Sequence, residues 1–247
     1  MSTSRMRARA LRWAVTAAAL VPLALPSSGL AGETPSVRIE APPAQRNQQI
    51  LERVARIAEN LRASQYNHAT VVDERQGRYE FDCSGFVTWV LRREAPGAYS
   101  AILARAKSGR PLARDYYWEL AQAPIGQRNP RGVRRVARID EARAGDIVAW
   151  LKPAIVKSTN TGHVGFLLET PEPVSSVEGG YLVRIADASS YQHQDDDRFE
   201  SGRTGFGTGT ILLVADPVTG FAQAYGWHGL QSRYVLQTPI AIGRVTR

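Results

Sequence analysis

The chain has 247 residues, a single cysteine and a formal net charge of +8. One cysteine excludes an intramolecular disulfide, so we expect the fold to be held together by a packed hydrophobic core. The excess of basic residues does not indicate nucleic-acid binding, because the sequence has no basic helix, zinc finger or RNP-like stretch.

Residues 1–31 have the pattern of a removable export signal. Four arginines within the first 12 residues precede an apolar run at 13–25, and residues 29–31 offer a small-residue cleavage site. The run is too short to span a bilayer comfortably, and Pro22 disfavours the alternative of an uncleaved anchor helix. We therefore expect an exported protein, periplasmic or extracellular, without a stable membrane anchor. Its formal charge falls to about +4 when the four arginines are removed.

The remainder is expected to form a proline-containing linker at 32–47 and a single domain at 48–247. Residues 48–61 place apolar side chains at helical spacing on one face and charged side chains opposite, which predicts an amphipathic helix. Residues 66–78 are polar and without periodicity, so we expect irregular structure there.

A second helix is predicted to begin at Cys83 and to end near Ala95. Apolar residues occupy almost every position within it, which indicates a largely buried helix. Asp82 is a suitable N-cap, because its carboxylate can accept a hydrogen bond from a first-turn amide. Pro96 follows the last helical position and cannot continue the helix.

Weaker helical patterns at 99–107 and 112–122 lead into a basic connector at 127–143. Beyond it, short apolar or alternating runs separated by glycine and proline predict strands. The six predicted strands span residues 146–151, 163–168, 181–186, 210–214, 222–227 and 240–245. The helices come first, and the links between strands are too short for crossover helices. The order predicts an α+β fold with N-terminal helices packed on one side of an antiparallel sheet.

Cys83 and His163 form a candidate nucleophile and base pair. Unpaired amides at a helix start favour an anionic sulfur, so we expect a lowered thiol pKa for Cys83. His163 lies at the entrance of a predicted strand, from which its imidazole could reach the sulfur. Asp187 follows the next strand and could accept a hydrogen bond from the ring, with His193 as the alternative third residue. The competing interpretation is a buried structural thiol and a turn histidine.

Four sequence blocks, in this order, resemble the NlpC/P60 cysteine peptidases. The blocks are Phe-Asp-Cys-Ser-Gly-Phe-Val at 81–87, Ala-Gly-Asp-Ile-Val at 144–148, Gly-His-Val-Gly at 162–165 and Asp-Ala at 187–188. The resemblance covers residues 51–227 and implies a papain-like core. It implies an endopeptidase that cuts peptidoglycan stem peptides, typically between D-glutamate and a diamino acid. Cys83 would be the nucleophile, His163 the base and then the acid, and the Cys83 amide part of an oxyanion hole.

The resemblance also implies substrate-binding roles for Asp82, Ser84 and Tyr66, whose counterparts in related enzymes hold the free amine of the stem peptide. Three departures stand out. Asp187 occupies the place where the family usually has histidine, asparagine or glutamine. The Tyr-Asn-His stretch at 66–68 lacks the paired glycines common in the family, so the amine pocket is expected to differ. A helical insertion around 99–138 separates the cysteine from the histidine, and it could form a wall or lid over the cleft or a decoration without substrate contact.

Two alternatives stay open: an amidase or acyltransferase with the same Cys/His site, and a catalytically inactive wall-binding module. We expect a cofactor-free monomer whose partner is the stem peptide. We also expect no metal site, because His193 and Asp195 to Asp197 are crowded on one polar loop. The glycine-rich run at 205–209 precedes a strand rather than a helix, so it predicts a bend or turn and not a phosphate-binding loop.

Overall fold

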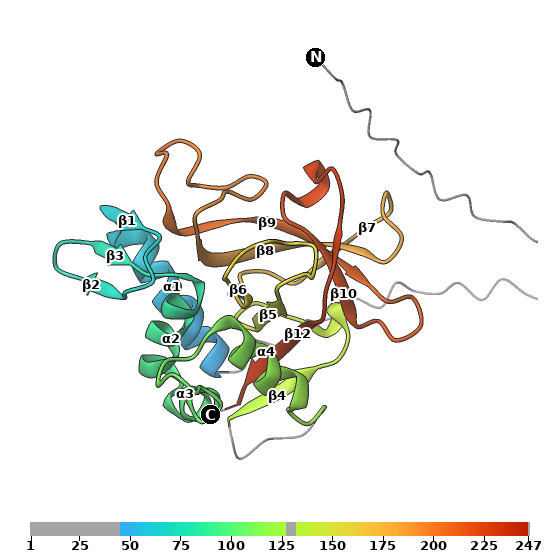
Figure 1. Cartoon of the computed structure of the whole chain (residues 1–247), viewed down its shortest axis with the longest axis horizontal. Coiled ribbons are helices and arrows are strands. Elements are labelled where there is room, and N and C mark those ends of the chain that lie inside the picture. Colours follow the sequence, from blue (N-terminus) through green and yellow to red (C-terminus); the bar gives the residue numbers. More distant parts are fainter. Residues whose placement is uncertain (1–44, 127–131, 247) are drawn as a thin grey trace, which may run out of the picture. The chain divides into compact units, whose positions relative to one another are not determined.

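The structure, a computed structural model, describes residues 45–126 and 132–246 (Figure 1). The predicted export signal at 1–31 and the linker residues 32–44 lie outside the described residues. Within the described part, no helix combines the length and apolar character that a membrane crossing requires.

Helix α1 (Gln45–Asn60) is the predicted amphipathic helix, with Ile50, Val54 and Ile57 buried on one face. It starts three residues earlier than the helix predicted at 48–61. The buried Asn47 side chain donates to Asp146 Oδ1 at 2.9 Å. Such a contact with a distant segment extends the helix and leaves no trace in the local pattern.

Three further helices follow: α2 (Cys83–Glu94), α3 (Pro96–Leu103) and α4 (Ala113–Gln122). Helix α2 stops at Ala95 as predicted, and Pro96 then opens α3, because proline is tolerated in a first helical turn. The predicted helix at 99–107 is therefore shifted towards the N-terminus.

The main sheet has nine strands in the order β11-β10-β9-β8-β6-β5-β12-β4, with β7 paired to β8. All its described pairings between strands are antiparallel, so the α+β class and the antiparallel sheet are confirmed. The strands are β4 (Val133–Val136), β5 (Ile147–Leu151), β6 (Gly162–Leu167), β7 (Glu172–Val174), β8 (Gly180–Ser189), β9 (Gly205–Ala215), β10 (Ala222–Gly226), β11 (Leu236–Gln237) and β12 (Ile240–Val245).

Three predictions of irregular structure are wrong. The connector at 127–143 contains β4, whose two central arginines hide the strand pattern. The segment at 66–78 belongs to a small sheet of β1 (Ala63–Gln65), β2 (Val71–Asp73) and β3 (Arg78–Glu80). Its three-residue strands are too short for alternation to be visible, and β1 pairs in parallel with β3 across the chain. The run at 205–209 is the first part of β9, paired throughout with β8.

The helices cover one face of the main sheet. The sheet is strongly curved, so that side chains from distant strands meet on its other face. Phe86 of α2 contacts Phe166 of β6 and Phe206 of β9, with ring centroids 5.7 and 5.3 Å apart. On the opposite face, the rings of Trp150 in β5 and Tyr225 in β10 lie 4.9 Å apart although three strands separate them in the sheet. Figure 1 shows α1 to α3 grouped beside the long strands β8 and β9.

Candidate active site

Cys83 is the first residue of α2 and is 6% exposed. The Asp82 carboxylate accepts a hydrogen bond from the Gly85 amide at 2.7 Å, which confirms the predicted N-cap. The backbone groups of Val164 and Ser84 lie within hydrogen-bonding reach of the sulfur. Since Val164 belongs to β6, the start of α2 and the start of β6 meet at this thiol.

Burial, followed by the negative charges of Asp82 and Asp187, raises the pKa of the Cys83 thiol to about 12. The expected lowering of this pKa is therefore wrong for the resting site. Desolvation of a buried anion outweighs the helix start and the two backbone hydrogen bonds. At neutral pH the sulfur is therefore a thiol, and any role as a nucleophile would require a base to take its proton.

His163, the second residue of β6, is held through its Nε2 atom, which donates to Asp187 Oδ2 at 2.6 Å. The rings of Trp150 and Trp227 lie 4.9 and 5.0 Å from the imidazole and restrict its rotation. With Nε2 protonated, Nδ1 carries the free lone pair of the neutral ring. The structure thus brings His163 and Asp187 together, and it places His163 next to Val164, whose backbone reaches the Cys83 sulfur.

Asp187, in β8, is fully buried and ionised. Its Oδ2 also accepts a hydrogen bond from His193 Nε2 at 2.8 Å, and its Oδ1 lies 3.0 Å from Nη2 of Arg198. Burial alone would raise the pKa of this carboxyl. The charges of His193 and Arg198 and the hydrogen bonds from both imidazoles outweigh burial and hold the pKa well below its usual value. His193 therefore contacts Asp187 and does not replace it as the partner of His163.

Sequence reasoning missed Arg198, which is 1% exposed and bonds the Asp196 carboxylate at 2.8 and 2.6 Å. The alternating glycines of β9 leave space for this side chain in the folded protein. A methyl group at Gly207 would lie 2.5 Å from Arg198 Nε, and one at Gly209 would lie 2.8 Å from His193 Cβ. The glycines leave room for the segment that delivers His193 and Arg198 to the buried carboxylate.

The predicted substrate-binding residues Tyr66, Asp82 and Ser84 line one small cleft with Cys83. Sequence reasoning missed a further residue there, Arg110, whose guanidinium forms an ion pair with Asp82 through Nη2 and Oδ2. Burial raises the pKa of the Asp82 carboxyl, but hydrogen bonds led by the one from Arg110 bring that pKa below its ordinary value. No pattern in the sequence marks Arg110, which lies in the turn between α3 and α4.

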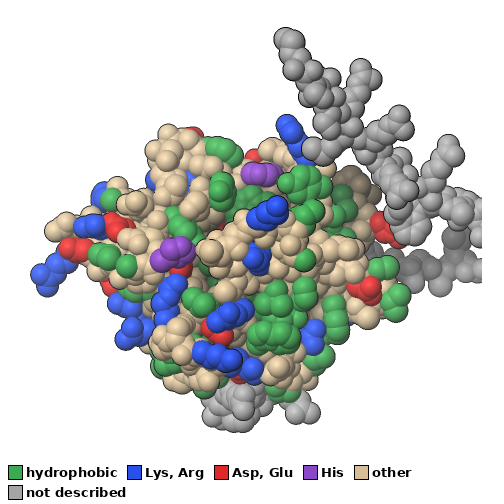
Figure 2. Space-filling model, in the orientation of Figure 1, with side chains coloured by type: hydrophobic (Ala, Val, Ile, Leu, Met, Phe, Trp, Pro, Cys, Tyr) green, Lys and Arg blue, Asp and Glu red, His purple; other side chains and the backbone are tan. Residues whose placement is uncertain are grey.

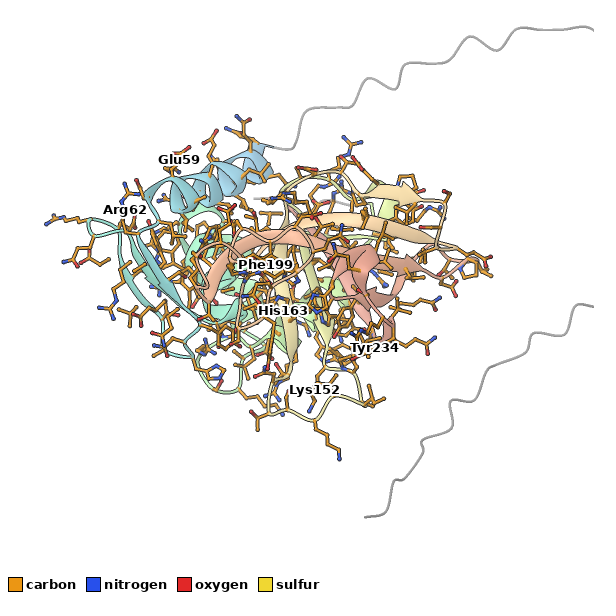
Figure 3. All side chains as sticks on the ribbon, turned by 90° about the horizontal axis from the view of Figure 1, so that it is seen from above. Glu59, Arg62, Lys152, His163, Phe199 and Tyr234 are labelled. Atoms are coloured by element: carbon orange, nitrogen blue, oxygen red, sulfur yellow. The ribbon has the colours of Figure 1, made fainter. Side chains whose placement is uncertain are left out.

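A second, larger cavity of about 810 Å³ adjoins the small cleft of about 130 Å³, and Tyr66 and Gly162 line both. His163 lines the larger cavity, with Lys152 and Tyr234 on loops around it (Figure 3). Among the described residues, its wall is rich in aromatic rings and has three cations and no carboxylate. The aromatic residues are Tyr66, Trp150, Tyr191, Tyr225, Trp227 and Tyr234, and the cations are Lys152, Lys157 and Arg233.

The loop that carries His193 and Asp195 to Asp197 does not gather its carboxylates around one point. Asp196 binds Arg198, and Asp197 pairs with Arg203 at 3.0 Å. A different trio could hold a metal ion, since one ligand atom each from His163, Asp187 and His193 lie within 4.8 Å of one another. Because the Arg198 guanidinium already pairs with Asp187, a second cation there would be repelled, and the trio fits proton transfer better than metal binding.

Comparison with known proteins gives one sequence relative and no structural one. No protein-family model matches the chain. No solved structure matches it. The uncharacterized protein R653 of Acanthamoeba polyphaga mimivirus is 28% identical over 182 residues, which cover 66% of this chain and 77% of the relative.

Proposed function

We propose that the chain is an exported cysteine peptidase with an NlpC/P60-like, papain-like core, and that it hydrolyses amide bonds in peptidoglycan stem peptides. One observation carries the proposal. The helix that begins at Cys83 meets strand β6 at the residue beside His163, and His163 is bonded to a buried, ionised Asp187. In this proposal Cys83 is the nucleophile, His163 the base and Asp187 the carboxylate that orients the base, and they act together where α2 meets β6.

In the first step, His163 Nδ1 takes the Cys83 proton as the sulfur attacks the scissile carbonyl carbon. The imidazolium that forms is stabilised by the Asp187 carboxylate at 2.6 Å. Because the resting thiol is neutral, proton transfer and attack belong to one event. The tetrahedral oxyanion lies at the start of α2, where the Cys83 amide can donate to it.

In the second step, His163 returns the proton to the leaving amine, and the carbon–nitrogen bond breaks to give a thioester on Cys83. Water then attacks the thioester with His163 again as base, which releases the carboxylic acid and restores the thiol. An acyltransferase would follow the same route with an amine in place of water.

The two cavities, which share Tyr66 and Gly162, support a division of the substrate between them. The small cleft at Asp82 and Tyr66 suits the acyl side of the stem peptide. The larger cavity beside His163 suits the leaving side, because its cations Lys152, Lys157 and Arg233 complement the carboxylates of a diamino acid. Burial is the main cause that raises the pKa of Tyr66, so its hydroxyl stays protonated and can donate between the two.

The test is mass spectrometry of defined muropeptides after incubation with the purified protein and with Cys83→Ala. We expect new products, cut after D-glutamate, with the unsubstituted protein alone. Products joined to an added amine would assign the acyltransferase alternative, and binding to the wall without any product would assign the inactive module. Identical product lists from both proteins would refute the hydrolase.

A further inference from the structure

Arg110 is delivered to the small cleft by the insertion between α2 and β6. Tyr116 of α4 is fully buried and shares a 2.7 Å hydrogen bond with Thr88 of α2, which fixes α4 against the cysteine helix. The turn before α4 therefore has a defined position, and Arg110 extends from it to Asp82. Nη1 donates to Oδ1 at 3.2 Å, and Nη2 pairs with Oδ2.

The Asp82 carboxylate has its acceptor positions occupied. Its Oδ1 accepts from the Ser84 hydroxyl at 2.9 Å, from the Gly85 amide at 2.7 Å and from Arg110. Its Oδ2 accepts from His68 Nδ1 at 3.0 Å and from Arg110. A carboxylate offers about four lone-pair positions, so an incoming ammonium group would find none free.

The charge of the small cleft also disfavours binding of an ammonium group. The Asp82 side chain is 5% exposed and its charge is neutralised by the guanidinium, whereas the Arg110 side chain is 35% exposed. The group that a ligand meets first is therefore a cation. A free amine would be repelled, but an amide carbonyl or a carboxylate could accept from the remaining N–H groups of Arg110.

We propose that Arg110 determines substrate class by making the small cleft select stem peptides whose N-terminal amine is acylated, and reject those whose amine is free. The inference rests on the proposed function and deepens it. An acylated amine carries no charge, and its carbonyl is an acceptor for Arg110. The chain would thus act on stems still linked through their N-terminus and not on released peptides.

The experiment compares two synthetic stem peptides that differ only in N-acetylation of the first residue. For the purified protein we expect kcat/KM to favour the acetylated peptide by tenfold or more, which corresponds to about 1.4 kcal/mol. In Arg110→Ala the ratio of the two kcat/KM values should fall by about tenfold, and Arg110→Gln should lower this ratio by a similar factor. Arg114→Ala, which removes an exposed cation of α4 that does not contact Asp82, should leave the preference unchanged.

Binding of both peptides to Cys83→Ala and to Cys83→Ala/Arg110→Ala, measured by calorimetry, separates this inference from the proposed function. If the acetylated peptide binds more tightly as expected, but the unsubstituted protein hydrolyses neither peptide, the hydrolase is refuted and the role of Arg110 stands. A preference for the free amine, a preference that Arg110→Ala does not alter, or no binding of either peptide at millimolar concentration would overturn the role of Arg110. Circular dichroism of each variant verifies that it is folded.

Discussion

His163 and His193 share one acceptor, the Oδ2 atom of Asp187, at 2.6 and 2.8 Å. His193 Nδ1 also lies 3.1 Å from the Trp227 carbonyl oxygen. The Oδ1 atom of Asp187 lies 3.0 Å from Nη2 of Arg198. One buried carboxylate thus joins both imidazoles and the guanidinium, so a change at Asp187 should affect all three side chains.

Asp187→Asn should lower kcat/KM by a factor of about 100 to 10,000, because a neutral amide cannot stabilise an imidazolium by charge. Its –NH2 group would also face donors on either side, the two rings or Arg198. The measurement is hydrolysis of a defined muropeptide. His193→Gln should cost less, since the bond between His163 and Asp187 remains. Equal activity of Asp187→Asn and the unsubstituted protein would remove Asp187 from the proposed mechanism.

The same variant tests the protonation state of the carboxyl. The folded-state pKa of Asp187 lies below the unfolded value of about 3.9, so its contribution to stability is present above that pH and is lost as the pH falls through the folded value. Urea unfolding should show the unsubstituted protein to be more stable than Asp187→Asn at pH 5, and the free-energy difference between them should shrink as the pH falls below 4. A difference that stays the same from pH 5 down to pH 2 would contradict the lowered pKa.

Arg198→Met should destabilise the fold by about 3–5 kcal/mol, because it leaves two buried carboxylates without their cation. Those carboxylates are Asp187 and Asp196. Arg203→Met is the matched control. Its ion pair with Asp197 is partly exposed, and such pairs contribute about 0–1 kcal/mol. Urea denaturation of both variants is the measurement, and equal losses would mean that burial of the Arg198 network adds nothing.

The cysteine helix and strand β6 could be predicted because their signals are local: an N-cap at Asp82, a proline after the last turn and an apolar run from His163. Asp187 could be placed because it ends such a run. Arg110 and Arg198 could not be placed, because a long side chain on a loop is positioned by the carboxylate that it finds in the folded chain. The buried environment of Cys83 was missed for the same reason, since the pKa of a thiol depends on what packs over it.

Alkylation of Cys83 by iodoacetamide should accelerate about tenfold per pH unit between pH 6 and pH 9, because only the thiolate reacts and its pKa is about 12. Asp82→Asn should increase the rate at pH 8, since the charge of Asp82 raises this pKa. Asp140→Asn removes an exposed carboxylate and should not alter the rate. A rate already constant at pH 5 would indicate a preformed thiolate and imidazolium pair.

Gly207→Ala should disturb the site by displacing Arg198, the ion-pair partner of Asp187. The added methyl group would lie 2.5 Å from Nε and 2.7 Å from Cδ of Arg198, so the guanidinium must move off the carboxylates. Overpacking of this kind costs about 1–3 kcal/mol, and we expect a loss of hydrolysis as well, because Asp187 loses a partner. Gly97→Ala is the control, as its methyl group would meet no atom within 4 Å.

The cause of the Gly207→Ala effect can be isolated by repeating it in an Arg198→Ala background. With the long side chain gone, the methyl group has room, so the two losses should be markedly less than additive in urea unfolding. Additive losses would show that the alanine acts through the backbone of β9 and not through Arg198. The coupling free energy between the two substitutions therefore measures whether Gly207 is needed to leave space for the Arg198 side chain beside Asp187.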